Sequence, residues 1–146
     1  MDAGDVTAIY AAIVATSALG WQIYVWRHAR AQRVHVDVSY GFLAFGHGPV
    51  EAVMIKVINR SDRAVIVEDA GVDAQDGSGR TLIIPRPPPG ATLPGKLDPD
   101  SNGTTWLLRE EVDEAGVDVH EPLTGYARLA TGETIKSKPA RLLSRS

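Results

Sequence analysis

Acidic and amide side chains alternate along residues 98–103 (DPDSNG), a pattern that opens calcium-binding loops. Asp98, Asp100 and Asn102 would direct oxygen atoms at one ion, and Gly103 would allow the sharp bend of such a loop. The twelfth position requires a glutamate that binds with both carboxylate oxygens, and this chain has Arg109 there. We therefore expect an ordinary turn at 98–103 and no calcium site.

The other residue types with catalytic or metal-binding chemistry are scattered along the chain. The histidines lack the spacing of a zinc site, and they are His28, His35, His47 and His120. Ser78 lies between two glycines, but its surroundings lack the G-x-S-x-G spacing of a hydrolase nucleophile, and we expect a turn there. The sequence thus predicts no catalytic residue, no cofactor and no bound metal.

Three further patterns have a structural interpretation, and two of them also have a functional alternative. Acidic residues at 110–114 (EEVDE) are typical of a solvated helix face, with a docking patch for a basic partner as the alternative. Residues 85–89 (PRPPP) predict a stiff connection, with a polyproline II ligand as the alternative. Asn59 and Asn102 begin formal glycosylation sequons, which we expect to be turn sequences only.

Length and composition bound the protein class. The 146 residues suffice for one domain with its own core, and 44% apolar and 23% charged residues are typical of a folded chain. Cysteine is absent, which excludes disulfides, thiolate metal sites and a cysteine nucleophile. The formal net charge of −3 argues against general nucleic-acid binding, so we expect no nucleic-acid partner.

The first 33 residues have the pattern of a membrane anchor. No residue from 6 to 26 carries a formal charge, and as a helix this run would be about 31 Å long, which matches a hydrocarbon core. We predict a transmembrane helix with a basic flank in residues 1–33, so the lipid bilayer is an expected partner. The expected membrane-interface anchors are Trp21, Tyr24, Trp26, Arg27, Arg30 and Arg33.

Two other interpretations of this segment are a cleaved signal peptide and an amphipathic helix packed on the domain or on other chains. The acidic start and the length of the apolar run disfavour a signal peptide, and the absence of a clean polar face disfavours the second interpretation. Basic residues beside a span stay in the cytoplasm. We therefore expect a single-pass protein of the cell membrane, with its N-terminus outside and its C-terminal domain cytoplasmic.

Small residues recur every four positions along the expected helix. Such a stripe lets two helix backbones approach closely in lipid, and it predicts a homodimer through the membrane helix. The alternative is that an alanine-rich helix shows such stripes by chance. The stripe consists of Gly4, Ala8, Ala12, Thr16 and Gly20.

Beyond residue 33, short apolar runs alternate with turn residues. Val34, Val36 and Val38 alternate with polar residues, which predicts a strand over 34–40 that continues toward 44. Residues 50–59 are apolar on both faces, which is typical of a central strand. Further strands are expected at 64–68, 81–84, 104–108, 123–130 and 133–137, and a short helix at 109–115.

These elements predict the fold class and the domain division. The protein is expected to be mainly β, with an N-terminal transmembrane helix in residues 1–33 and an antiparallel immunoglobulin-like β-sandwich of about seven strands in residues 34–146.

Several segments carry a resemblance to a group of proteins. They are 57–61 (VINRS), 64–67 (AVIV), 93–99 (LPGKLDP) and 137–139 (SKP), preceded by the apolar helix and a valine-rich strand. Together they resemble small uncharacterised single-pass membrane proteins of high-GC bacteria and their phages. The resemblance spans most of the chain and implies an immunoglobulin-like sandwich, without catalytic residues.

We therefore expect a membrane-anchored, non-catalytic β-sandwich module that binds or scaffolds a protein partner at the cytoplasmic face. The alternative is a structural component of a phage or secretion-type assembly, in which the N-terminal helix packs between copies. An enzyme ranks only third, because no set of polar residues in the sequence points to one reaction.

Overall fold

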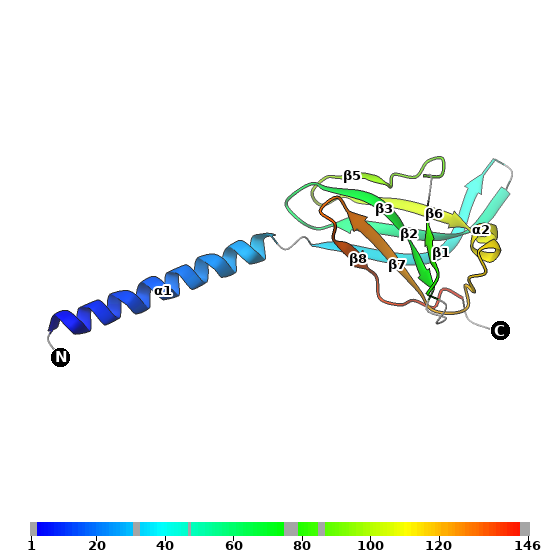
Figure 1. Cartoon of the computed structure of the whole chain (residues 1–146). Helices are drawn as coiled ribbons and strands as arrows, with labels where there is room; N and C mark the ends of the chain where they lie inside the picture. Colours follow the sequence, from blue (N-terminus) through cyan, green and yellow to red (C-terminus); the bar gives the residue numbers. More distant parts are fainter. Residues whose placement is uncertain (1–2, 31–32, 47, 75–78, 85–86, 144–146) are drawn as a thin grey trace. The chain divides into compact units, whose positions relative to one another are not determined.

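The computed structural model describes residues 3–30, 33–46, 48–74, 79–84 and 87–143, without the side chains of residues 27–30 and 45. The chain divides into two compact units, Met1–Gln32 and Arg33–Ser146. The elements (Figure 1) are α1 (Ala3–Arg30), β1 (Val34–Phe45), β2 (Gly48–Asn59), β3 (Val65–Ala74), β4 (Thr81–Ile83), β5 (Gly95–Leu97), β6 (Asn102–Leu108), α2 (Arg109–Glu114), β7 (Leu123–Leu129) and β8 (Thr134–Lys136).

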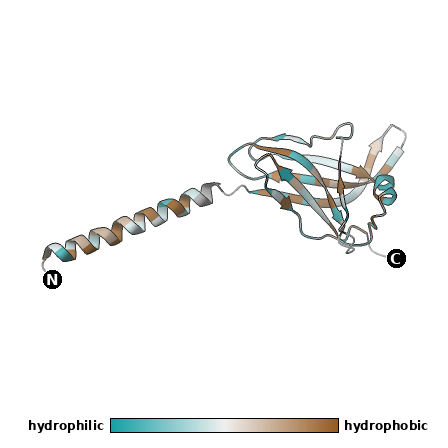
Figure 2. Cartoon of the chain, in the orientation of Figure 1, coloured by the Kyte–Doolittle hydropathy of each residue, from teal (hydrophilic) through white to brown (hydrophobic). Residues whose placement is uncertain are grey.

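Helix α1 is the apolar N-terminal element that the sequence predicts. Its segment Ala3–Trp26 has a mean hydropathy of 1.5 and is long and apolar enough to cross a membrane. Apolar residues lie along its length in Figure 2. The hydroxyls of Thr7, Thr16 and Ser17 donate to carbonyls four residues earlier, at 2.9, 2.8 and 2.8 Å. These internal bonds lower the cost of placing the hydroxyls in an apolar medium.

The second unit consists of two antiparallel sheets. One sheet has the strand order β1-β2-β6, so β2 is central, and this confirms the prediction from its two apolar faces. The other sheet has the order β4-β3-β7-β8, and β5 pairs with the remaining part of the β3 edge. Buried residues from both sheets, among them Val36, Val53, Ile55, Val72 and Leu123, form one hydrophobic core.

The described residues form eight strands, which corrects the expected number of about seven. The additional strand is β5, whose three residues follow the proline-rich segment and are too few to show an alternating pattern. Strand β3 also runs to Ala74, well beyond the expected end at residue 68. Its pairing with β7 shifts between Val67 and Asp69, so the buried positions change from odd to even numbers. This shift conceals the second half of β3 from a period-2 analysis.

The connections at the two ends of β6 are fixed by polar side chains. Asn59, at the end of β2, is fully buried, and its Nδ2 donates to the carbonyls of Arg63 (2.7 Å) and Asp98 (3.0 Å). Helix α2 follows β6, and Glu111 accepts a hydrogen bond from the Leu108 amide at 2.8 Å. The helix ends before Gly116, whose φ of 72° suits glycine, and this confirms the expected end of the helix.

Candidate functional site

The expected membrane-interface residues lie at the end of the apolar segment of α1. The rings of Trp21 and Tyr24 stack with their centroids 5.7 Å apart, and both side chains are exposed, as is that of Trp26. Arg33 is exposed at the start of the second unit, whereas the side chains of Arg27 and Arg30 lie outside the described residues.

The stripe of small residues is exposed along α1 at Gly4, Ala8, Ala12, Thr16 and Gly20. A Cβ added at Gly4 or Gly20 would meet no atom within 4 Å. The Thr16 hydroxyl already donates to Ala12 within the helix. A homodimer through this stripe stays a prediction.

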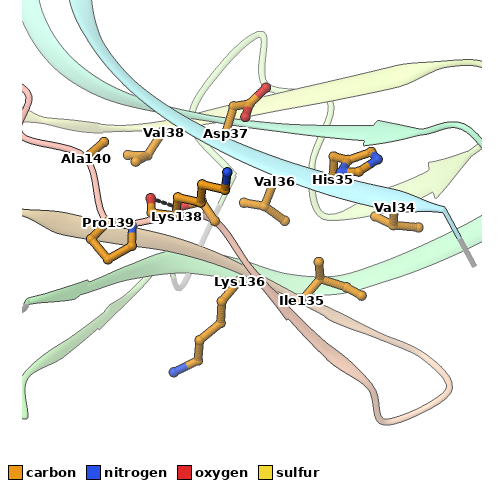
Figure 3. Close-up of a pocket in the computed structure, with 11 residues that line it drawn as sticks. Val34, His35, Val36, Asp37, Val38, Ile135, Lys136, Lys138, Pro139 and Ala140 are labelled. Carbon is orange, nitrogen blue, oxygen red and sulfur yellow. Dashed lines mark hydrogen bonds between the residues drawn. The ribbon is translucent and has the colours of Figure 1, made fainter.

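The second unit contains a pocket of about 530 Å³ between β1 and the chain at residues 135–140. We call it the β1–β8 groove. Its lining consists of Val34, His35, Val36, Asp37, Val38, Ile135, Lys136, Ser137, Lys138, Pro139 and Ala140. In Figure 3 the side chains of Val34, Val36 and Lys138 lie between β1 and this C-terminal segment, whereas Asp37 points away from it. The lining of the groove is thus mixed, with valine and isoleucine side chains beside Lys138 and other polar groups.

The backbone of β1 leaves its outer edge open at this groove. The Arg60 amide donates to the Arg33 carbonyl at 2.8 Å, and the β1–β2 register runs without interruption from there. Hydrogen-bonded and non-hydrogen-bonded pairs alternate in an antiparallel ladder. Odd-numbered residues of β1 therefore bond to β2, and the amides and carbonyls of Val34, Val36 and Val38 face the groove.

Strand β8 borders the same groove with a second open edge. The Leu129 amide donates to the Glu133 carbonyl at 2.8 Å, and the Ser137 amide donates to the Gly125 carbonyl at 2.7 Å. By the same alternation, the backbone groups of Lys136 point away from β7. The two sheets therefore leave an unclosed seam between β1 and β8.

The inner wall of the seam is packed closely at Gly125 on β7. A Cβ at this position would lie 3.3 Å from side-chain atoms of Val36 and Val38, and 3.6 Å from the Ser137 hydroxyl. That hydroxyl accepts from the Gly125 amide at 2.9 Å and donates to the Lys138 carbonyl at 2.9 Å. Ser137 thus fixes the path of the chain where Lys138 reaches the groove.

A second polar cluster lies on one face of the sheet that contains β3, β7 and β8. Arg128 pairs with Asp69 at 2.6 Å, and Lys136 pairs with Asp73 at 2.8 Å, with Tyr126 on the neighbouring strand. Burial raises the pKa of Tyr126 to about 12, and the negative charges of Asp69 and Asp73 act in the same direction. Because the charges pair with one another across strands, this cluster is a set of sheet contacts.

A third cluster joins the β1–β2 hairpin to α2. The Tyr40 hydroxyl bonds to Glu51, and Arg109 donates from Nη1 to Tyr40 at 3.2 Å and from Nε to Asp113 at 2.9 Å. Burial and the bond to Glu51 raise the pKa of the Tyr40 phenol. The hydrogen bond to Tyr40 is the main cause that raises the pKa of Arg109.

The expected calcium-like turn is exposed at Asp98 and Asp100, and its backbone is bound to the buried Asn59. The Asp98 carbonyl accepts from Asn59 and from the Ser101 hydroxyl (2.7 Å), while its carboxylate pairs with Lys96 at 3.2 Å. Asp100 adopts a φ of 53°, as a residue in a tight turn does. Within the described ranges, no group of three or more His, Cys, Asp or Glu side chains is placed to hold a metal ion.

The remaining candidates lie apart from one another. His35 is exposed on β1, and His120 is half-buried between α2 and β7. His47, Ser78, Pro85 and the His28 side chain fall outside the described residues.

The acidic run and the sequons have structural partners or positions. Glu111 caps α2 and Asp113 pairs with Arg109, whereas Glu110 and Glu114 are exposed. The first sequon asparagine, Asn59, is fully buried, and the second, Asn102, is exposed on β6.

Sequence reasoning missed the β1–β8 groove. Its two walls come from opposite ends of the second unit, and only the sheet topology brings them together. The available signal was the valine alternation at Val34, Val36 and Val38, which predicts a strand without predicting that its outer edge is open.

No protein-family model and no curated protein sequence matches the chain. Among solved structures, the chain is similar to the X-ray structure of Northeast Structural Genomics Consortium target SoR45. The sequence identity is 16%, the match covers 81% of this chain and 90% of that chain, and the TM-score is 0.39.

Proposed function

We propose that the protein is a single-pass, membrane-anchored module that binds or scaffolds another protein at the cytoplasmic face, without catalysing a reaction. The observation that carries the proposal is the division of the chain into an apolar helix and a β unit with its own core. Every described side chain of α1 is exposed, including Ile13, Leu19 and Ile23. In water this surface would be a large apolar patch, whereas in a bilayer it faces acyl chains.

The proposed orientation rests on charge. Basic residues at 27, 30 and 33 follow the apolar segment, whereas the charged side chains before it in the sequence are those of the acidic residues Asp2 and Asp5. Positive charges beside a span are retained in the cytoplasm, so the β unit would face the cytoplasm.

The proposed fold of the β unit is an immunoglobulin-like sandwich. The strand order β1-β2-β6 matches strands A, B and E of that fold, and β3-β7-β8 matches strands C, F and G. The common core between the two sheets supports the same assignment.

Fractionation of cells that express the full chain tests the anchor. We expect the chain to stay with membranes after alkaline carbonate washing and to be released by detergent. A chain of residues 33–146 should be soluble, with a β-type circular dichroism spectrum. A full chain found in the soluble fraction, or a truncated chain that still pellets with membranes, contradicts the proposal.

Protease treatment of sealed and opened inverted membrane vesicles tests the orientation. A cytoplasmic β unit lies on the outer surface of inverted vesicles, and we expect its digestion without opening. Protection of the β unit until the vesicles are opened would place it on the other side of the membrane.

The expected homodimer is proposed for the exposed small-residue stripe of α1. Ala12→Ile together with Gly20→Ile should reduce cross-linking in membranes, because bulky side chains hold two backbones apart. Ala11→Ile with Ala18→Ile is the matched control, since at 100° per residue these positions lie on another face. Equal cross-linking in both double variants would refute dimerisation through the stripe.

A further inference from the structure

Strand β1 differs from the other sheet edges in being long and unprotected. Strands β4, β5 and β8 have three residues each. The outer edge of β6 is covered where Thr92 donates to the Thr104 carbonyl at 3.0 Å and the Thr104 amide donates to the Thr92 hydroxyl at 2.8 Å. Strand β1 has twelve residues, and its β2 pairing contains no bulge.

Natural edge strands are protected by lysine, proline, bulges or a covering segment. Strand β1 contains neither lysine nor proline. At Val34, Val36 and Val38 its open edge also borders a preformed groove rather than bulk solvent alone. The amides and carbonyls there have no backbone partner among the residues that the structure describes, and they match a ligand with the same backbone groups, which is an extended peptide.

The side chains around the groove define the chemistry of that peptide. The half-buried Val38 and Ile135 give an apolar lining that accepts small apolar side chains. Lys138 is exposed beside this lining and makes no ion pair with any residue that the structure describes. Lys136, by contrast, is neutralised by Asp73 at 2.8 Å. Lys138 is thus the cation on the groove side of β1, whereas the Asp37 carboxylate points away from the groove, so this side favours a carboxylate in the ligand.

We propose that the β1–β8 groove binds an extended, acidic peptide segment of a partner protein by strand addition to the open edge of β1, with Lys138 pairing a ligand carboxylate. The groove-lining part of β1, residues 34–38, has the length of about five residues of added strand, or about 16 Å at 3.3 Å per residue. The ligand is a β-forming segment whose apolar residues and one acidic residue occupy alternate positions, because only side chains on the same face of the added strand reach both the apolar lining and Lys138. This inference specifies the partner class of the proposed binding module and rests on that function.

The binding test uses the full chain in dodecyl maltoside micelles and a fluorescein-labelled peptide, SVTVTETSG, in which the two valines and the glutamate share one face of the strand. We expect saturable binding in fluorescence polarisation, with a Kd below about 100 µM. The peptide SPTPTETSG, which lacks the amide hydrogens of the two valine positions, should bind at least about tenfold more weakly. The peptide SVTVTKTSG should also bind about tenfold more weakly, because its lysine faces Lys138.

Two protein variants test the two proposed contacts. Val38→Pro removes an amide that faces the groove and should weaken binding about tenfold, whereas Phe42→Pro removes an edge amide outside the groove and should not. Lys138→Glu should weaken binding of SVTVTETSG and restore that of SVTVTKTSG, while Lys96→Glu, on β5, should change neither. Urea unfolding of each variant checks that the β unit is still folded.

Hydrogen exchange distinguishes peptide binding from a purely structural role of β1, because only binding changes the protection of the edge amides. The amides of Val36 and Val38 should exchange freely in the unbound chain and become protected when SVTVTETSG is added.

Three outcomes overturn the proposal: no saturable binding up to about 1 mM peptide, equal binding by folded Val38→Pro and wild type, or no charge reversal with Lys138→Glu. A dimer that Val38→Pro dissociates, without peptide binding, assigns the edge to a second copy of the chain instead. Peptide binding by a chain that fractionates as soluble leaves the groove intact and refutes the anchor.

Discussion

Replacement of Asn59 by alanine should reduce the free energy of unfolding of the β unit by about 3–4 kcal/mol. The Asn59 side chain is fully buried, and its Nδ2 donates to the carbonyls of Arg63, Asp98 and, at 3.3 Å, Leu97. Its Oδ1 accepts from the Ser61 amide at 3.1 Å and from the Ser61 hydroxyl at 2.6 Å. Two amide hydrogens and one oxygen thus make about four effective bonds, each worth about 1 kcal/mol net.

Urea unfolding of residues 33–146 measures this loss. Trp106 is the only tryptophan in that part of the sequence, so its fluorescence follows the β unit. With a slope of about 1.5 kcal/mol per molar urea, the midpoint should fall by about 2 M. Asn102→Ala is the control, because this asparagine is exposed on β6, and its midpoint should move by less than about 0.3 M. A decrease of less than about 1 kcal/mol in the free energy of unfolding for Asn59→Ala would show that the Asn59 hydrogen bonds do not stabilise the β unit as proposed.

Three other changes have outcomes that the structure fixes. Gly71→Ala should lower the free energy of unfolding in urea by more than about 3 kcal/mol, because its Cβ would collide with the Leu82 carbonyl and lie 2.8 Å from the Tyr126 ring. Gly132→Ala is the control, and it should lower this free energy by about 1 kcal/mol, because Gly132 has a φ of 87° but open space around it. The stabilisation from the neutral Tyr126 phenol is fully present below pH 10.0 and is lost as the pH rises toward about 12, so wild type should lose about 2 kcal/mol that Tyr126→Phe does not lose. Millimolar calcium should leave the thermal midpoint of the chain unchanged, because Arg109 stands where a calcium loop requires a bidentate glutamate, and a rise of several degrees would refute this expectation.

Local patterns in the sequence predicted most of the elements. The valine alternation from Val34 indicates β1, and the two apolar faces of residues 50–59 place β2 at the centre of its sheet. Gly116 marks the end of α2. These features depend on residues close in the chain, so composition and spacing suffice. Strand β5 and the second half of β3 escaped prediction, because one is too short to show a pattern and the other follows the irregularity after Val67.

The groove and the role of Asn59 depend on long-range placement and were not predicted. A sequon and a turn were all that residues 59–61 indicated, yet the carboxamide of Asn59 accepts and donates within a buried network that reaches Asp98. In the same way, Lys138 belongs to a plain terminal segment until the fold places it beside Val36. Interactions between distant segments are set by the strand order, which a single sequence does not specify.

The order of the strands also has a consequence for how the protein folds. Strand β2 has its first partner close by in the chain, because β1 is the preceding strand of the same hairpin. Its second partner, β6, lies about fifty residues further along the chain, with Ile58 paired to Asn102 and Ala52 paired to Leu108. Closing that loop costs chain entropy before the stabilising contacts of β6 form, so we expect a late transition state and slow folding for a chain of this size. Until β6 docks, the β1–β2 hairpin has open backbone edges on both sides, and this interval is when a nascent chain is most exposed to misassociation. A folding rate in the millisecond-to-second range, slowed further by changes in β6, would be the kinetic signature of this topology.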